Sequence, residues 1–166
     1  MVEKALASAA DAVFLDLEDA VAPDSKAEAR IDIVCALKEL EWRGRPTVFR
    51  ANALDTPFSY RDLIEVVEQA GDSLDAVMIP KVNRPEDLHV VSTLLSQLEL
   101  AMDLEKGRLT IEAQIESAEG LANVDSIARA TGRLTTLHFG PGDFAASVSM
   151  PHASIGVMDE LSLIHI

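Results

Sequence analysis

The sequence contains a single cysteine, Cys35, among its 166 residues. One thiol excludes an internal disulfide framework and a zinc site made of several cysteines. Because Cys35 stands in an apolar helical stretch, we expect it to be buried as a small hydrophobic residue. No apolar run approaches the roughly 18 residues of a membrane span, and Glu3 interrupts the short apolar start that a secretory signal would need. The sequence therefore predicts a cytoplasmic protein with no membrane partner.

Basic residues are also few. The chain has 14 Lys and Arg against 28 Asp and Glu, which gives a formal net charge of −14. A protein that binds the phosphate backbone needs a clustered basic face, so nucleic acid is not an expected partner. An anionic ligand would have to be held by a few local cations or by a metal. With 48% apolar and 25% charged residues, the chain can bury a sizeable core, and its length is typical of one domain.

Five short apolar runs are predicted to be buried strands. They cover residues 12–17, 47–50, 76–80, 109–115 and 135–139. A helical pattern fills each gap between them, which indicates successive βα units with parallel strands. We therefore expect an α/β fold with no internal linker.

Charged side chains lie at or just beyond the end of each predicted strand. In chain order they are Asp16, Glu18 and Asp19, then Arg50, Lys81, Glu116 and Asp143. In a parallel sheet or barrel the carboxyl ends of the strands meet at one edge, where function collects. Single residues also have ordinary structural interpretations, Asp19 as a helix cap and Lys81 as a solvated loop residue. Their common position at one edge favours a functional site.

Carboxylates beside an arginine indicate a site for a hard divalent cation. Mg²⁺ takes a few carboxylate oxygens, keeps several waters and completes its shell from the substrate. Glu116 and Asp143 are the expected ligands because they come from adjacent strand ends. Arg50 offers a planar fork that can bind a substrate carboxylate at two points. The segment Gly140-Pro141-Gly142 allows close approach to a ligand and could turn N–H groups toward an oxyanion, but it lacks the spacing of a dinucleotide-binding loop.

Five short motifs occur in order and together resemble one family. They are Asp16-Leu17-Glu18-Asp19-Ala20-Val21, Phe49-Arg50-Ala51-Asn52, Ile79-Pro80-Lys81, Ile115-Glu116-Ser117-Ala118 and Phe139-Gly140-Pro141-Gly142-Asp143-Phe144. From about residue 2 to 157, the chain strongly resembles the CoA-ester lyases of the HpcH/HpaI aldolase/citrate lyase β-subunit family. The resemblance implies a (β/α)8 TIM barrel and a Mg²⁺-dependent carbon–carbon lyase, such as one that cleaves malyl-CoA into acetyl-CoA and glyoxylate. A citryl-CoA lyase similar to the citrate lyase β subunit is the alternative within the family.

The resemblance also implies roles for individual residues. A pair of acids binds Mg²⁺, or Mn²⁺ in its place, other acids hydrogen-bond the metal-bound waters, and an arginine holds the 2-oxo acid. The implied positions are Glu116 and Asp143 for the metal, Glu18, Asp19 and Arg50 for catalysis, and Arg50, Lys81, Gly140, Pro141 and Gly142 for substrate binding. The implied partners are an acyl-CoA, a 2-oxo acid and, in the full-length protein, further copies of the same chain in a homo-oligomer.

The chain departs from the family pattern at both ends. The family's first strand would precede Val2, and its pattern continues for about a hundred residues beyond Gly156, into a region that supplies an acid–base aspartate in several members. We therefore expect a fragment, a partial TIM barrel of about five βα units at 1–157, followed by a truncated or non-native tail at 158–166. Two alternatives are an inactive fragment and a non-catalytic α/β binding module such as a phospho-acceptor receiver domain. A receiver needs an Asp where this chain has Arg50-Ala51-Asn52.

Overall fold

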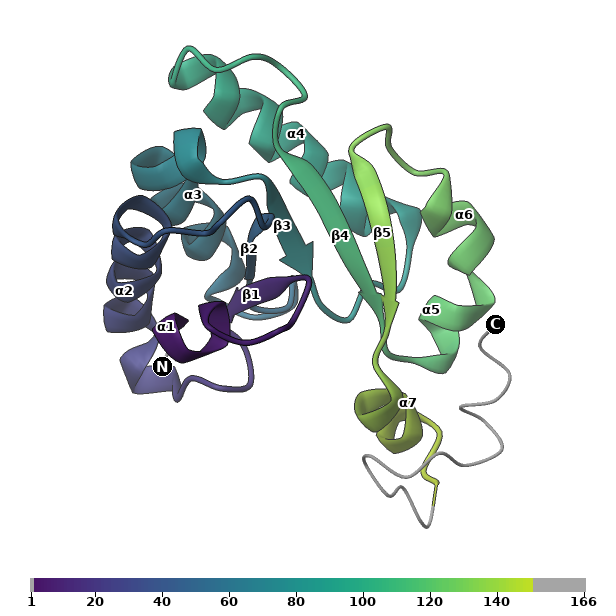
Figure 1. Ribbon diagram of the computed structural model, residues 1–166. Helices are drawn as coiled ribbons and strands as arrows, with labels where there is room; N and C mark the ends of the chain where they lie inside the picture. The colour runs from purple at the N-terminus through teal and green to yellow at the C-terminus, as the bar shows by residue number, and fades with distance from the viewer. Residues whose placement is uncertain (1, 151–166) are drawn as a thin grey trace.

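The computed structural model describes residues 2–150 of the chain. Within this range, five parallel strands form one sheet in the order β1-β2-β3-β4-β5, so each strand pairs with its neighbour in sequence (Figure 1). The strands are β1 (Val13–Asp16), β2 (Thr47–Arg50), β3 (Ala76–Ile79), β4 (Thr110–Ile115) and β5 (Leu134–Phe139). All five predicted strands are confirmed, with bounds within about one residue of those expected.

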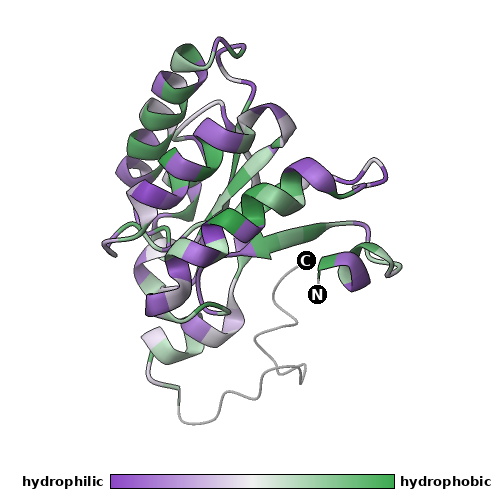
Figure 2. Ribbon diagram, turned by 90° about the vertical axis from the view of Figure 1, so that its left-hand side faces the viewer, coloured by the Kyte–Doolittle hydropathy of each residue, from purple (hydrophilic) through white to green (hydrophobic). Residues whose placement is uncertain are grey.

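Helices precede, connect and follow the strands. In the described part of the chain they are α1 (Val2–Leu6), α2 (Lys26–Glu39), α3 (Ser59–Ala70), α4 (Pro85–Ala101), α5 (Ala118–Ala122), α6 (Val124–Ala128) and α7 (Pro141–Ser147), with 3₁₀ turns η1 (Pro23–Ser25) and η2 (Gly71–Ser73). Helices α2, α3, α4 and α6 contact one another in that order, as Figure 1 shows for the first three. The helices carry both hydrophobic and hydrophilic residues (Figure 2), as expected for elements that cover a parallel sheet on one side and face water on the other.

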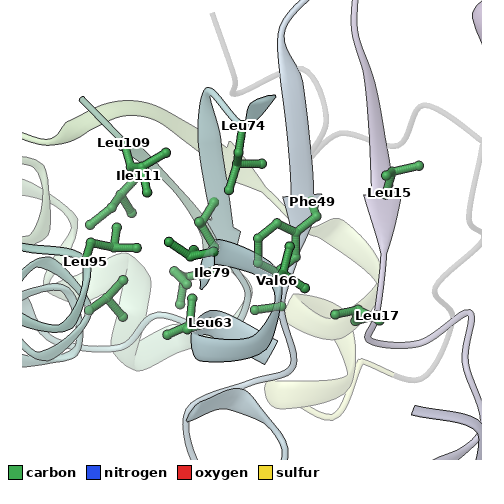
Figure 3. Packing of buried hydrophobic residues seen from close by; sticks show 14 of the residues in the cluster. Leu15, Leu17, Phe49, Leu63, Val66, Leu74, Ile79, Leu95, Leu109 and Ile111 are labelled. Atoms are coloured by element: carbon green, nitrogen blue, oxygen red, sulfur yellow. The ribbon is translucent and has the colours of Figure 1, made fainter. Parts of the chain in front are cut away.

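The main hydrophobic core lies between the sheet and these helices (Figure 3). Phe49 and Ile111 from the strands belong to the same buried cluster as Val66 from α3 and Leu95 from α4, and all four are fully buried. Burying a side chain of this size contributes roughly 1.5–3 kcal/mol. The α/β fold predicted from the apolar runs is therefore built around the core that those runs supply.

The opposite face of the sheet carries a second, smaller cluster. It consists of Val48 on β2 and Ala76 and Met78 on β3, with Val48 and Ala76 paired in register. Phe14 pairs in register with Val48, so it shares this face, and it is exposed. Among the described strands β1 pairs only with β2 and β5 only with β4, which leaves two open sheet edges. Sequential parallel strands with open edges form a partial (β/α)8 barrel, as predicted.

One burial prediction is wrong. Cys35 is exposed, because it falls between the core-facing positions of α2 rather than on them. Its apolar neighbours Val34 and Ala36 are buried, which is why the local composition was misleading. In the range 2–150 no helix is both long enough and apolar enough to cross a membrane. The tail predicted at 158–166 lies outside the described residues.

Candidate functional site

Backbone hydrogen bonds continue past the ends of the strands and hold the segments that follow them. They join Leu17 N to Arg50 O (2.9 Å), Ala51 N to Met78 O (3.0 Å), Val82 N to Gln114 O (3.0 Å) and Gly140 N to Ile115 O (3.0 Å). Because the ladder continues from β1 to β5, the polar residues beyond each strand stay side by side. The contacts of Arg50 and Lys81 confirm that these polar residues lie together at one edge of the sheet.

Arg50, at the end of β2, is surrounded by acceptors. Its Nε and Nη2 bind the two carboxylate oxygens of Asp16 at 2.8 and 2.7 Å, and Nη1 lies 3.1 Å from Glu18 Oε2. Asp19 Oδ2 lies 3.6 Å from Nη2, and Gln114 Oε1 accepts from Nη1 at 3.4 Å. The planar fork that the sequence suggested for a substrate is thus engaged by Asp16.

Lys81, which follows β3, joins carboxylates from three other strand ends. Its Nζ lies 2.7 Å from Glu18 Oε1 and 3.3 Å from Asp143 Oδ2. Its backbone N–H donates to Glu116 Oε2 at 2.9 Å. Lys81 has a φ of +53°, in the left-handed region that a residue with a side chain adopts only when its surroundings impose it. It is therefore a central member of the site and not a solvated loop lysine.

The five acids Asp16, Glu18, Asp19, Glu116 and Asp143 are called the carboxylate cluster here. They face two cations, Arg50 and Lys81, so the cluster keeps a formal excess of three negative charges. Burial raises the pKa of Glu18, against the opposing effects of Lys81 and Arg50. Burial also raises the pKa of Glu116, and the charges of Glu18 and Asp143 raise it further. The cluster thus carries excess negative charge that an additional cation would offset.

Gly140 makes room for Glu116. A Cβ atom at Gly140 would lie 2.3 Å from Glu116 Oε1 and 2.6 Å from its Cγ, so a larger residue would displace this carboxylate. Gly140 also precedes α7, whose first turn carries Asp143. Because the Gly140 N–H donates to Ile115 and Pro141 has none, only Gly142 in this segment has a backbone N–H to offer a ligand. The oxyanion-binding role suggested for the whole segment is thus reduced to one group.

One residue that supports the site, Lys26 at the start of α2, was not predicted from the sequence. Its side chain is buried, and its Nζ donates to the carbonyl oxygens of Leu17 (2.5 Å) and Glu18 (2.7 Å). These bonds fix the backbone from which Glu18 reaches Arg50 and Lys81. Gln114 was also outside the expected site, although it shares strand parity with Glu116, and that parity was the signal that could have identified it.

Glu116 and Asp143 are suitable donors for a hard divalent cation. Both offer carboxylate oxygens. The pKa of Glu116 is raised by burial and then by the charges of Glu18 and Asp143, and a bound cation would offset both effects. Over residues 2–150, no group of three or more His, Cys, Asp or Glu side chains is arranged as a protein-only metal site. Mg²⁺ does not need one, because it is commonly held by one or two carboxylates, with waters and substrate completing its shell.

This arrangement can be compared with known proteins. The model of the HpcH/HpaI aldolase/citrate lyase family matches residues 1–157. The chain belongs to this family. The resemblance carried by the five motifs is thereby confirmed, over nearly the same range of residues.

Two curated relatives and one solved structure place the chain more closely. The L-malyl-CoA/β-methylmalyl-CoA lyase of Cereibacter sphaeroides is 48% identical over 163 residues, which cover 96% of this chain and 50% of the relative. The (3S)-malyl-CoA thioesterase of the same species is 38% identical over 144 residues, 87% of this chain and 45% of the relative. The malate synthase of Haloferax volcanii superposes with a TM-score of 0.78 at 21% identity, covering 89% of this chain and 48% of that one, and shows the shared fold. The chain thus spans about half the length of the curated relatives it matches.

Proposed function

We propose that the protein containing this chain is a Mg²⁺-dependent carbon–carbon lyase that cleaves a 3-hydroxyacyl-CoA such as malyl-CoA into acetyl-CoA and glyoxylate. The observation that carries the proposal is the carboxylate cluster, in which Glu116 and Asp143 both contact Lys81 at the carboxyl edge of the sheet. The name of the relative at 48% identity supports the same substrate class.

In this proposal Glu116 and Asp143 hold Mg²⁺, or Mn²⁺ in its place. When bound, the cation supplies a Lewis acid for the oxygen whose charge changes as the carbon–carbon bond breaks. Glu18 and Asp19, which both lie beside Arg50, would accept hydrogen bonds from metal-bound water. Lys26, through the carbonyls of Leu17 and Glu18, keeps this acidic segment in place.

Arg50 binds the carboxylate of the 2-oxo acid in this proposal, through the Nη1 that faces Glu18 and Gln114. Its two bonds to Asp16 prevent rotation of the guanidinium, so the orientation of the substrate carboxylate is fixed before the reaction. Lys81 and the Gly140-Pro141-Gly142 segment line the same edge and complete the substrate-binding surface.

Two other reactions are consistent with the family and differ in their products. A citryl-CoA lyase of the citrate lyase β-subunit type would release oxaloacetate in place of glyoxylate. A thioesterase, the activity in the name of the relative at 38% identity, would add water to the thioester and release malate and free CoA thiol. Lyase cleavage leaves the thioester intact in acetyl-CoA, so free thiol separates these cases.

The test is an assay of the protein produced from its complete reading frame. With malyl-CoA and Mg²⁺, we expect glyoxylate and acetyl-CoA in equal amounts and no free thiol. EDTA should abolish the reaction, and Mg²⁺ or Mn²⁺ should restore it. Release of thiol with malate would contradict the lyase proposal and favour the thioesterase. Cleavage of citryl-CoA alone would favour the alternative within the family.

We also propose a cytoplasmic homo-oligomer. The sequence-based expectation and the family support this assignment, and light scattering of the purified complete protein together with cell fractionation tests it. A monomer, or recovery in the membrane fraction, would contradict it.

A further inference from the structure

We propose that Lys81 is an exchangeable internal cation: its ammonium neutralises Glu18 and Asp143 until a divalent cation binds, and it then moves to the carboxylate of the incoming 2-oxo acid. This inference rests on the proposed function, because it assigns an order of binding to the same site. It begins with the two contacts of Lys81 Nζ, 2.7 Å to Glu18 and 3.3 Å to Asp143. Asp143 is also one of the two carboxylates proposed to bind the divalent cation.

The two cations of the site differ in freedom. The Arg50 side chain is 12% exposed and is held at two points by Asp16, so its guanidinium is fixed. The Lys81 side chain is 40% exposed and ends in a compact ammonium on a flexible four-carbon stem. Of these two positive groups, Lys81 is the one whose charged end is exposed to solvent and can change partners.

The backbone of Lys81 is fixed by hydrogen bonds, whereas its side chain is partly exposed to solvent. Its N–H donates to Glu116, and the next residue, Val82, donates to Gln114 O at 3.0 Å. These two bonds impose the left-handed backbone, with its φ of +53°. A backbone held in place beside a solvent-exposed ammonium allows the side chain to change partners without moving the strand ends.

Charge determines the direction of the exchange. A divalent cation on Glu116 and Asp143 would repel the ammonium and take over one of its two partners. The displaced ammonium would remain within reach of the site, where the carboxylate of the 2-oxo acid brings a new negative charge. The cation is therefore expected to bind before the 2-oxo acid, and Lys81 to contribute to the affinity for the acid only after the cation has bound.

Two measurements on the complete protein test the exchange. The first is the acetylation rate of individual lysines, read by mass spectrometry with and without Mg²⁺. We expect the Lys81 rate to rise several-fold when Mg²⁺ is added. Lys106 is exposed and Lys26 is buried, so their rates should stay high and low respectively, whether or not Mg²⁺ is present. An unchanged rate at Lys81 on saturation with Mg²⁺ would overturn the exchange.

The second is calorimetric titration with Mg²⁺ alone and with glyoxylate in the presence of Mg²⁺. Lys81→Gln should bind Mg²⁺ about tenfold more tightly, and glyoxylate about tenfold more weakly, than the unmodified protein. Lys81→Arg keeps the charge and should retain weak Mg²⁺ binding, and Lys106→Gln should change neither affinity. Unchanged or weaker Mg²⁺ binding in Lys81→Gln contradicts the inference. Failure to cleave malyl-CoA would contradict the proposed function only. The acetylation rates and the Mg²⁺ affinities do not depend on that reaction, so they would still test the exchange.

Discussion

Two sets of charges lie at opposite ends of the sheet and behave differently. At the carboxyl ends of the strands, the carboxylate cluster keeps more acids than cations, and the pKa values of Glu18 and Glu116 are raised. At the amino ends, Glu99 of α4 and Arg133 before β5 form a pair with 0% and 7% side-chain exposure. Acidic side chains thus outnumber basic ones at the carboxyl ends of the strands, whereas the acid and the base are matched at the amino ends.

The Glu99–Arg133 pair has every charge matched. The guanidinium binds both Glu99 oxygens, at 2.8 and 2.6 Å, and also donates to Leu109 O and Ser96 Oγ. The backbone N–H groups of Gly107 and Leu109 donate hydrogen bonds to the same two carboxylate oxygens of Glu99. Although burial alone would raise the pKa of Glu99, Arg133 and these N–H groups hold it below its ordinary value. We call the Glu99–Arg133 network closed, because every charge in it is matched, and the carboxylate cluster open, because its acids outnumber its cations. A closed network stabilises the fold, whereas an open one is suited to a ligand.

The largest expected effect comes from breaking the closed network. Arg133→Met should lower the free energy of unfolding by about 3–5 kcal/mol, because it leaves a buried carboxylate without its partner. Chemical denaturation of the purified protein measures this. Arg129→Met is the matched control, since Arg129 pairs with Asp125 at the surface and should cost at most about 1 kcal/mol. Equal losses in the two variants would contradict the distinction between the networks.

At the open end, the next prediction concerns the space that Gly140 leaves. Gly140→Ala should weaken Mg²⁺ binding about 10–100-fold, because the added Cβ displaces the Glu116 carboxylate. Calorimetric titration measures the change. Gly132→Ala is the control: nothing lies within 4 Å of a Cβ at Gly132, and Mg²⁺ affinity should not change. Normal Mg²⁺ binding in Gly140→Ala would remove Glu116 from the proposed ligand set.

A smaller effect of opposite sign to the first is expected at Glu116. In EDTA at pH 7, Glu116→Gln should raise the free energy of unfolding by about 1 kcal/mol, because burial and neighbouring carboxylates disfavour its ionised form. Glu105 is exposed, so Glu105→Gln should leave stability nearly unchanged. Denaturation curves of the two variants and the parent protein provide the comparison. A clear loss of stability in Glu116→Gln would show that ionised Glu116 stabilises the fold without a bound cation, as ionised Glu99 does.

The smallest effect is a pH dependence at the closed end. Because the pKa of Glu99 in the fold lies below its ordinary value of 4.5, ionised Glu99 stabilises the protein fully above that value. This contribution should disappear as the pH falls through the lowered pKa. The difference in stability between the parent protein and Glu99→Gln should therefore shrink below about pH 4.5, as measured by denaturation between about pH 3 and 6. A difference that stays constant over this range would contradict the assignment.

The open end was the more predictable of the two from sequence. Its acids directly follow apolar strands, so the strand-end rule located Glu116 and Asp143 without knowledge of any contact. The closed pair was not predicted, because Glu99 lies in a helix and Arg133 in a loop, 34 residues apart. Lys26 was missed for a similar reason: a lysine in the first turn of a helix is ordinary, and only packing turns it inward. Residues defined by long-range contacts leave little local pattern.

The role of Asp16 illustrates the same limit. The sequence placed Arg50 at the site but not its bidentate bond to Asp16, because the register that sets these two residues opposite each other is a property of the folded sheet. Cys35 shows the converse error, in which an apolar neighbourhood indicated burial that the orientation of the helix does not give. Sequence patterns identified the elements and the edge, and contacts between elements determined which partners meet.

The most direct test of the central claim is to locate the cation in crystals of the complete protein soaked with Mn²⁺, by its anomalous scattering. We predict one strong peak at the carboxyl edge of the sheet, bound to carboxylate oxygens of Glu116 and Asp143 at about 2.0–2.3 Å. Lys81 Nζ should have moved away from Asp143 in the same crystals. A peak elsewhere, or no peak at a saturating concentration of Mn²⁺, would contradict the claim that these carboxylates are assembled to hold a cation.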